Sequence, residues 1–241
     1  MSMLLRIADR TLNRPLLILP EKLAIITEVL SGRIGLDGAR PEFAARDTQE
    51  AARIDAALAA ATPAASRFVG ENYDRDEGGR PKGWLPYRRT DEGVAIITIT
   101  GSLVNRGAWV GASSGLTSYE GIAHQVESAT RDQKVKSIVL DIESPGGEAV
   151  GAFETAALIR KCGEAKPIFA MVNGMAASAA YAIATACRSI VSIDTGISGS
   201  IGVVMMHADY SRAIDKAGIT PTLIHAGAHK VDGNPYQPLP A

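Results

Sequence analysis

From residue 94 to the C-terminus, apolar residues follow two different spacings. Short runs rich in β-branched residues predict strands, and apolar residues three or four positions apart predict helices. Strands are expected at residues 94–104, 136–144, 167–172, 189–194, 201–207 and 221–227. Helices are expected at 118–132 with Ser118 as N-cap, at 149–163 ending at a glycine, from 175 or 176 to about 187, and at 210–218. Because strands alternate with helices of crossover length, the pattern predicts an α/β fold with a mostly parallel sheet.

The N-terminal part of the chain has a different character. Apolar residues at helical spacing predict helices at 20–35 and 47–62. The stretch 70–93 is polar and rich in glycine and proline, which is typical of a linker or mobile arm. We therefore expect two domains, a helical appendage with a linker over residues 1–90 and a compact domain over residues 91–241.

Composition narrows the class of protein without identifying it. The 241 residues carry a formal net charge of −1, which gives no reason to expect nucleic acid as a partner. The two cysteines have no metal-ligand spacing and are expected to be small core residues of a reducing compartment. The charged N-terminus lacks the pattern of a secretory signal. The uncharged run 167–187 is weakly hydrophobic and contains Asn173, so we interpret it as a buried strand and helix and expect no membrane segment.

Three of the expected strand ends carry unusual residues: ESPGG comes after one strand, NGMAAS after the next, and SGSIG before or within another. Ligands of parallel sheets bind at the carboxyl ends of the strands. Ser178 is expected in the first turn of its helix, where unpaired N–H groups and the helix dipole favour negative charge, so it is either a nucleophile or a small core residue. The paired glycines after Pro145 let a ligand approach the backbone, and they also suit an ordinary strand-to-helix turn.

A nucleophilic serine needs a base, and the residues alone leave two kinds open. Of the four histidines, His207 is the best placed, with Asp209 or Asp194 to orient it. Lys230 is the other candidate, although a loop lysine is usually solvated and charged. Lowering a lysine pKa from ~10.4 to ~7.5 needs roughly 4 kcal/mol, so Lys230 would have to be enclosed by apolar surface in the folded or assembled protein.

Four stretches together resemble a known family: LDIESPGGEAVGAFE, VNGMAASAAYAIATAC, SGSIGVV and HKVDGNPYQPL. Their order and spacing are similar to those of the signal peptide peptidase A family of serine–lysine peptidases, in its bacteriophage branch of protein C-type capsid assembly proteases. The resemblance covers about residues 94–239, and residues 12–35 also look like the N-terminal region of that branch. It implies a Clp-protease/crotonase-like fold of repeated ββα units.

The resemblance also implies roles for single residues. Ser178 falls on the family's nucleophile and Lys230 on its general base. Gly147 and Ala179 would donate the N–H groups of the oxyanion hole, and Ser200 would hold the lysine ammonium. An extended substrate would bind beside the turn formed by Ser144, Pro145 and Gly146, adding a strand to it.

The function implied is that of a serine endopeptidase without cofactor or metal, cleaving scaffold and portal-type proteins in a prohead. The expected location is the host cytoplasm or the viral prohead, not a secreted form, and the expected assembly is a homo-oligomer. The sequence departs from the family's pattern in two ways. Ala179 and Ala180 stand where many members have glycines. The chain also stops soon after Lys230, so we expect its C-terminal part to be truncated, which could leave Lys230 exposed.

Three other hypotheses stay open. The first is a non-enzymatic minor capsid or scaffold component on a degenerate peptidase fold. The second is a crotonase-type acyl-CoA enzyme, for which Glu143 and Glu148 beside the glycine turn would be the acid and base. The third is a Ser–His–Asp peptidase that uses His207.

Overall fold

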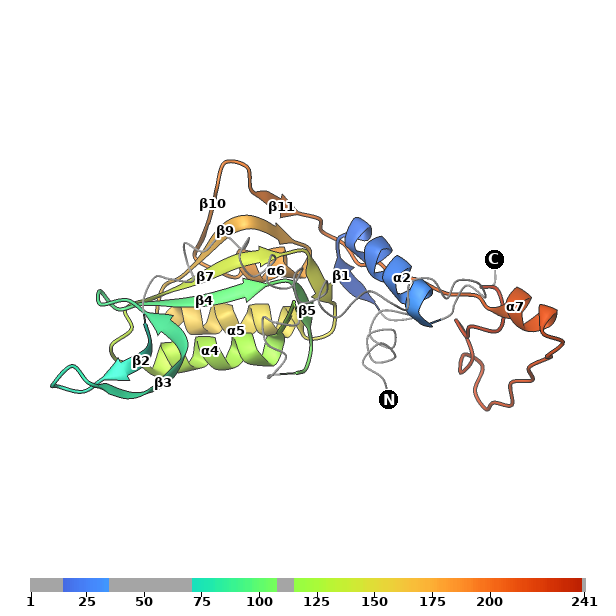
Figure 1. Ribbon diagram of the computed structural model, residues 1–241, viewed down its shortest axis with the longest axis horizontal. Coiled ribbons are helices and arrows are strands. Elements are labelled where there is room, and N and C mark those ends of the chain that lie inside the picture. The colour runs from blue at the N-terminus through green and yellow to red at the C-terminus, as the bar shows by residue number, and fades with distance from the viewer. Residues whose placement is uncertain (1–14, 35–70, 108–114, 240–241) are drawn as a thin grey trace, which may run out of the picture.

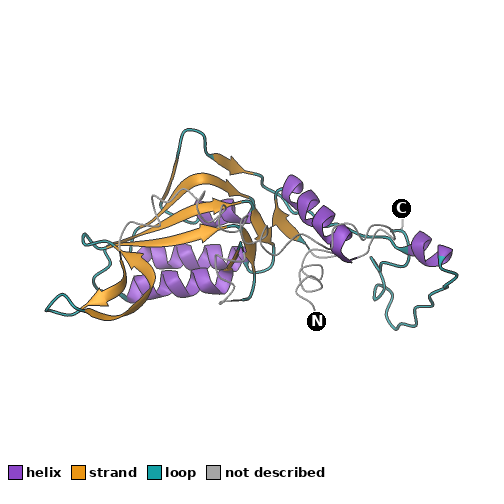
Figure 2. Ribbon diagram, viewed as in Figure 1, coloured by secondary structure: helices purple, strands orange, loops and turns teal. Residues whose placement is uncertain are grey.

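The computed structural model describes residues 15–34, 71–107 and 115–239, which form two sheets and the helices that cover them (Figures 1 and 2). The larger sheet has the strand order β10-β9-β7-β4-β3-β2, and a short strand, β11, pairs with the end of β9. These strands are β2 (Glu71–Arg75), β3 (Pro81–Arg89), β4 (Val94–Thr100), β7 (Ser137–Ser144), β9 (Ile168–Ala177), β10 (Ser189–Ser192) and β11 (Ile197–Gly199). The pairs from β4 through β7 and β9 to β10 are parallel, which confirms the predicted α/β class.

The smaller sheet, of order β1-β8-β5-β6, stands at the carboxyl ends of the larger sheet. Its strands are β1 (Leu16–Ile18), β5 (Ser102–Val104), β6 (Leu116–Ser118) and β8 (Gly146–Glu148). Strand β4 continues into β5 through Gly101, which has φ 70°, and β7 continues into β8 through Pro145. The turn after β7 is therefore itself a strand, and residues 94–104 form two strands where the sequence predicts one.

Helices α4 (Tyr119–Arg131) and α5 (Ala152–Ala165) run side by side along one face of the larger sheet (Figure 1). The hydroxyl of Ser118 accepts the Gly121 N–H at 3.0 Å, so the predicted N-cap is confirmed. The apolar side chains of these helices and of the central strands form one buried core, and its largest fully buried members are Ile97, Ile99, Leu103, Ile122, Ile138, Leu140, Ile142, Ile159, Ile168 and Ile183. This core fixes the strand ends that carry the candidate site.

The stretch 173–177 corrects the predicted start of the alanine-rich helix. It continues strand β9, and helix α6 (Ala179–Thr185) begins only after Ser178. The reason is pairing on both sides, since Ala176 lies opposite Ser144 of β7 and Ala177 lies opposite Gly199 of β11. Ladder hydrogen bonds from two neighbours outweigh the helix propensity of alanine, which is a weak preference.

Other predicted boundaries are also corrected. Helix α5 passes through Gly163 and ends at Ala165, where the N–H of Lys166 bonds the Cys162 carbonyl. Residues 201–207 and 221–227 form no strand; the former has a single bridge, at Val204, and the latter lies in the exposed chain beyond α7 (Ser211–Lys216). An apolar run forms a strand only where a neighbouring strand can pair with it.

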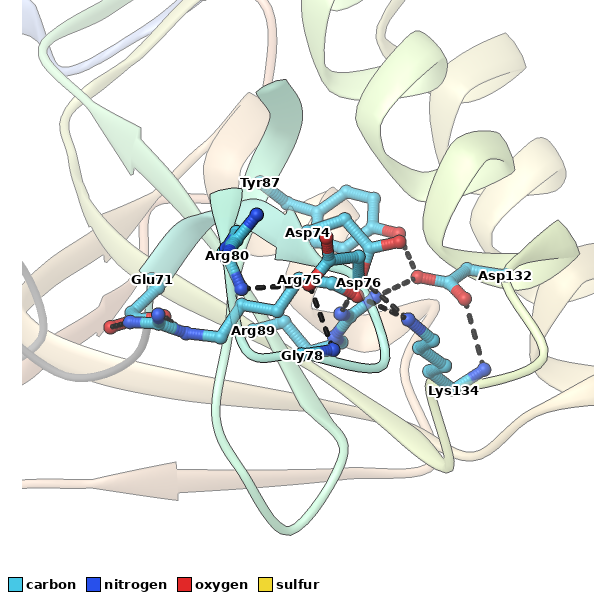
Figure 3. A network of polar contacts seen from close by, with 10 residues as sticks. All are labelled: Glu71, Asp74, Arg75, Asp76, Gly78, Arg80, Tyr87, Arg89, Asp132 and Lys134. Atoms are coloured by element: carbon cyan, nitrogen blue, oxygen red, sulfur yellow. Dashed lines mark hydrogen bonds and ion pairs between the residues drawn. The ribbon is translucent and has the colours of Figure 1, made fainter. Parts of the chain in front are cut away.

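Residues 71–89 form a hairpin joined to β4, so the linker predicted over 70–93 is wrong for this part. Figure 3 shows the polar network that fastens the hairpin to the end of α4. Arg89 binds Asp132 at 2.6 Å and Asp74 at 2.5 Å, and Tyr87 donates its hydroxyl to Asp132 at 2.8 Å. Lys134 binds Asp74 at 2.7 Å and donates its N–H to Asp132.

These contacts lower the pKa values of two carboxyl groups. The ammonium of Lys134 and the guanidinium of Arg89 hold the pKa of Asp74 far below its usual value. Burial works against ionisation of Asp132, yet hydrogen bonds from Lys134, Tyr87 and Arg89 outweigh it and lower its pKa as well. Ion pairs and hydrogen bonds thus hold a segment whose composition resembles that of a linker.

Helix α2 (Pro20–Ile34) confirms the first of the two predicted N-terminal helices. The second, at 47–62, lies outside the described residues, and the domain boundary at residue 90 stays a prediction. Among the helices that the structure describes, none is long and apolar enough to cross a bilayer. Both cysteines are unpaired and partly buried, and burial raises the pKa of the Cys187 thiol to about 12.

Candidate active site

Ser178 stands at the junction between strand β9 and helix α6. It is 4% exposed, and its φ of 56° and ψ of −114° are unusual for a residue with a side chain. Such a conformation costs roughly 1–3 kcal/mol and persists only where the surroundings impose it. Its side chain makes no capping hydrogen bond to the helix, so the hydroxyl is not needed to start α6. Strained backbone of this kind is concentrated at functional sites.

The glycine turn lies directly against this serine. A Cβ on Gly146 would lie 3.0 Å from the Ser178 Cβ and 2.9 Å from the Ala177 carbonyl oxygen. A Cβ on Gly147 would overlap the backbone of Leu103 in β5. Both positions therefore require glycine, Gly146 because of its φ of 93° and both because neighbouring backbone is so close.

The third predicted stretch, SGSIG, meets the other two. The N–H of Ser178 donates to the Gly199 carbonyl at 2.7 Å, and the Ser178 hydroxyl lies 3.5 Å from the Gly202 carbonyl oxygen. Ser200 lies between these two glycines and also has a φ of 56°; Ser178 and Ser200 are the two non-glycine residues with positive φ in the described part of the chain. The predicted clustering of the three strand ends is confirmed.

The residues predicted to border the substrate have different surroundings. Ser144 is 1% exposed, and its hydroxyl donates to the Gly101 carbonyl at 2.6 Å and accepts the Gly146 N–H at 3.2 Å. Ser144 therefore shapes the turn from inside. Ala179, the first residue of α6, is fully buried, and Gly147 is buried in β8. The roles predicted for these residues in binding and in the oxyanion hole stay predictions.

Lys230 is not brought to Ser178 within one copy of the chain. It is exposed, in a loop of turns after α7, where its N–H lies 3.4 Å from the Gly227 carbonyl oxygen. The segment that joins β11 to α7 runs past α2 and away from α6 (Figure 1). The side chain that the base hypothesis needs to be enclosed is thus open to solvent here.

The side chains behind the rival hypotheses differ in their contacts. One carboxylate oxygen of Glu148 accepts the Asn105 N–H at 2.7 Å, which holds the loop after β5. Glu143 lies against Gly174 of β9. The Nε2 atom of His207 is buried and has no hydrogen-bond partner in the described part of the chain. The neighbouring Met206 contacts Thr27 of α2, and Asp209 accepts the Ser211 N–H before α7. Within the described ranges, no group of three His, Cys, Asp or Glu side chains is placed to hold a metal ion.

Sequence reasoning missed one neighbour of the site. Strand β1 pairs with β8 along the glycine turn, with Leu17 opposite Gly147 and Ile18 opposite Gly146. The run LLIL has the composition of a strand, but it directly precedes a helix, and no local pattern shows which sheet it joins. The one sequence feature that could have drawn attention to this run is that residues 12–35 resemble the N-terminal region of the phage branch.

Comparison with known proteins gives a consistent result. Residues 160–241 match the model of peptidase family S49. The chain is 43% identical over 153 residues to the head-tail preconnector protein GP5 of Enterobacteria phage P21, covering 64% of this chain and 30% of that protein. It is 35% identical over 234 residues to the capsid assembly protease C of Escherichia phage lambda, covering 97% of this chain and 50% of that protein. The chain thus spans half or less of the length of these curated relatives.

Among solved structures, an enoyl-CoA hydratase from Polaromonas sp. JS666 matches with a TM-score of 0.36 and 18% identity, over 55% of this chain and 52% of that one. The sequence matches extend across the stretches that hold Ser178 and Lys230. The resemblance found from the four stretches is therefore confirmed, and the chain is related to peptidase family S49 and to bacteriophage head proteins that include a capsid assembly protease.

Proposed function

We propose that the protein is a serine endopeptidase whose nucleophile is Ser178. The observation that carries the proposal is the strained, buried serine at the start of α6, in contact with a turn that must be glycine. The hydroxyl would attack the scissile carbonyl of a bound peptide, and the N–H groups of Gly147 and Ala179 would hold the resulting oxyanion. One such donor is typically worth about 3 kcal/mol of transition-state stabilisation.

Lys230 is the proposed general base, acting once the chain has assembled. Its neutral amine would take the proton of the Ser178 hydroxyl, and Ser200 would hold the ammonium group that this forms. The ammonium would then give the proton to the leaving amine, and water would hydrolyse the acyl-enzyme. A base that must be uncharged needs enclosure, which one copy of the chain does not give it. We therefore propose that assembly into a homo-oligomer encloses it.

Exposed apolar side chains support assembly. Ile201, in the segment that leads from the site to α7, is 87% exposed, and Ile224, in the extended chain beyond α7, is 96% exposed. The edge strand β10 adds two more, Ile190 and Val191. Apolar side chains gathered along an edge strand and an extended arm are typical of surfaces that another protein covers.

The proposed substrates are scaffold and portal-type proteins within a phage prohead, cleaved in the host cytoplasm or inside the assembling particle. This part of the proposal comes from the resemblance and from the printed names of the two phage relatives. No cofactor, nucleic acid or membrane is part of the proposed reaction.

The test is cleavage of the cognate scaffold protein by the assembled chain, with products identified by mass. Ser178→Ala and Lys230→Met should each abolish cleavage, since the first removes the nucleophile and the second keeps the stem but cannot take a proton. Ser189→Ala and Lys216→Met are matched controls at exposed positions and should cleave normally.

Each variant has its own contrary outcome. Unchanged cleavage by Ser178→Ala would end the peptidase proposal and leave the capsid-component hypothesis. Cleavage lost with Ser178→Ala but kept with Lys230→Met would mean that another base acts, and His207→Ala would then be the next variant to test.

A further inference from the structure

The N-terminal strand β1 occupies the edge of the glycine turn at which a substrate would bind. Its register with β8 is antiparallel. The Ala149 N–H donates to the Pro15 carbonyl at 3.3 Å, and the Leu19 N–H donates to the Pro145 carbonyl at 3.2 Å. Because hydrogen-bonded pairs recur every second residue in an antiparallel ladder, Leu17 and Gly147 form the pair between them.

The other edge of β1 is also occupied. The N–H of Leu16 donates to the Val204 carbonyl at 2.8 Å, and the N–H of Val204 donates back at 2.9 Å. Val204 follows directly on the stretch 199–202 that contacts Ser178. Strand β1 therefore lies in a groove between the glycine turn on one side and the segment after β11 on the other.

The Leu17 carbonyl is next to the nucleophile. The point where a Gly146 Cβ would stand is in contact with the Leu17 carbonyl oxygen and only 3.0 Å from the Ser178 Cβ. A chain segment in this register thus passes its backbone carbonyl beside the serine. That is the placement a scissile peptide needs.

The side chains of β1 show what the groove accepts. Leu16, Leu17 and Ile18 are each 5% exposed. Leu17 belongs to the main core, whereas Leu16 and Ile18 pack with Leu23 of α2 and with Val204. The residue whose carbonyl lies next to Ser178 thus has its aliphatic side chain buried in the core.

We propose that residues 15–19 are a built-in occupant of the peptide groove, and that the groove takes extended peptides with an aliphatic residue at the position of Leu17. The proposal rests on the peptidase function proposed above and names its substrate class. A tethered strand is present at an effective concentration in the millimolar range, so it competes strongly with free peptide. Peptide binds only the fraction of molecules in which β1 has left, which weakens its apparent affinity by that fraction.

The test uses a fluorescein-labelled peptide with the sequence of residues 13–19, NRPLLIL, titrated with the full chain and followed by anisotropy. Leu17→Pro removes the central N–H of β1 and should release the strand, tightening peptide binding at least tenfold. Asn72→Pro places the same residue at an exposed position of the edge strand β2 and is the matched control, expected to bind as the native chain does.

A second variant gives the reverse perturbation and decides the matter if Leu17→Pro does not fold. Leu16 and Glu148 lie opposite each other in a non-hydrogen-bonded pair, where Cβ atoms come close enough for a disulfide. Oxidised Leu16→Cys/Glu148→Cys should bind the peptide at least tenfold more weakly than its own reduced form.

Equal peptide affinity for the native chain and Leu17→Pro, or an equal gain with Asn72→Pro, would overturn the proposal. Equal peptide affinity for the oxidised and reduced forms of Leu16→Cys/Glu148→Cys would also overturn it. The readout separates this proposal from the peptidase one. If peptide affinity changes with the β1 variants but no cleavage depends on Ser178, only the peptidase function is refuted. If cleavage depends on Ser178 but peptide affinity does not change with the β1 variants, only the proposal that β1 occupies the groove is refuted.

Discussion

Gly146→Ala tests the packing around the candidate nucleophile most directly. Two costs combine in this substitution. Gly146 has a φ of 93°, and left-handed backbone costs a residue with a Cβ about 1–2 kcal/mol. The new methyl would also meet the carbonyl oxygens of Leu17 and Ala177 and the Cβ of Ser178, atoms that cannot rotate away. Overpacking of this kind costs about 1–3 kcal/mol, so we expect a total loss of about 2–5 kcal/mol.

Thermal unfolding measures the loss. In a protein of this size 1 kcal/mol shifts the Tm by about 2–4 °C, so Gly146→Ala should lower it by about 4–20 °C. Gly79→Ala is the matched control, because Gly79 has a φ of 77° and an added Cβ would meet nothing within 4 Å. It carries only the backbone cost of about 1–2 kcal/mol. If Gly146→Ala were no less stable than Gly79→Ala, the close contact of glycine turn, β1 and Ser178 would be refuted.

Three further predictions concern stability. Gly163→Ala should stabilise the protein by about 0.5–1 kcal/mol in urea unfolding, because Gly163 lies inside α5 with open space around it; a loss would contradict this. Ser178→Gly should be about 1–2 kcal/mol more stable than Ser178→Ala in the same assay, because only glycine relieves the positive φ, and equal midpoints would argue against strain. Asp132→Asn should cost about 1–3 kcal/mol at pH 7, since the lowered pKa of Asp132 means that its ionised form stabilises the fold. That stability is present above the ordinary carboxyl pKa of ~3.9 and is lost as the pH falls through the lowered value, so the two proteins should converge in acid. Asp91→Asn, at an exposed site, is the matched control and should cost little at pH 7.

The sequence by itself determined most helices and the chemistry at the strand ends. Helix α4 and its cap at Ser118 follow from spacing and from a hydroxyl at the right position. The alternation of strands and helices was enough for the α/β class, and motif spacing was enough to relate the chain to a peptidase family. These features are local, because periodicity, caps and motifs are each contained in a short run of residues.

Only the tertiary structure decided which runs are paired and where the site's parts meet. Residues 173–177 are strand because β7 and β11 flank them, whereas residues 221–227 have the composition of a strand but no partner. The place of β1 beside Gly146 could not be read from the sequence either. Pairing joins segments far apart in the chain, and its energy belongs to both partners, so no single stretch of sequence contains it.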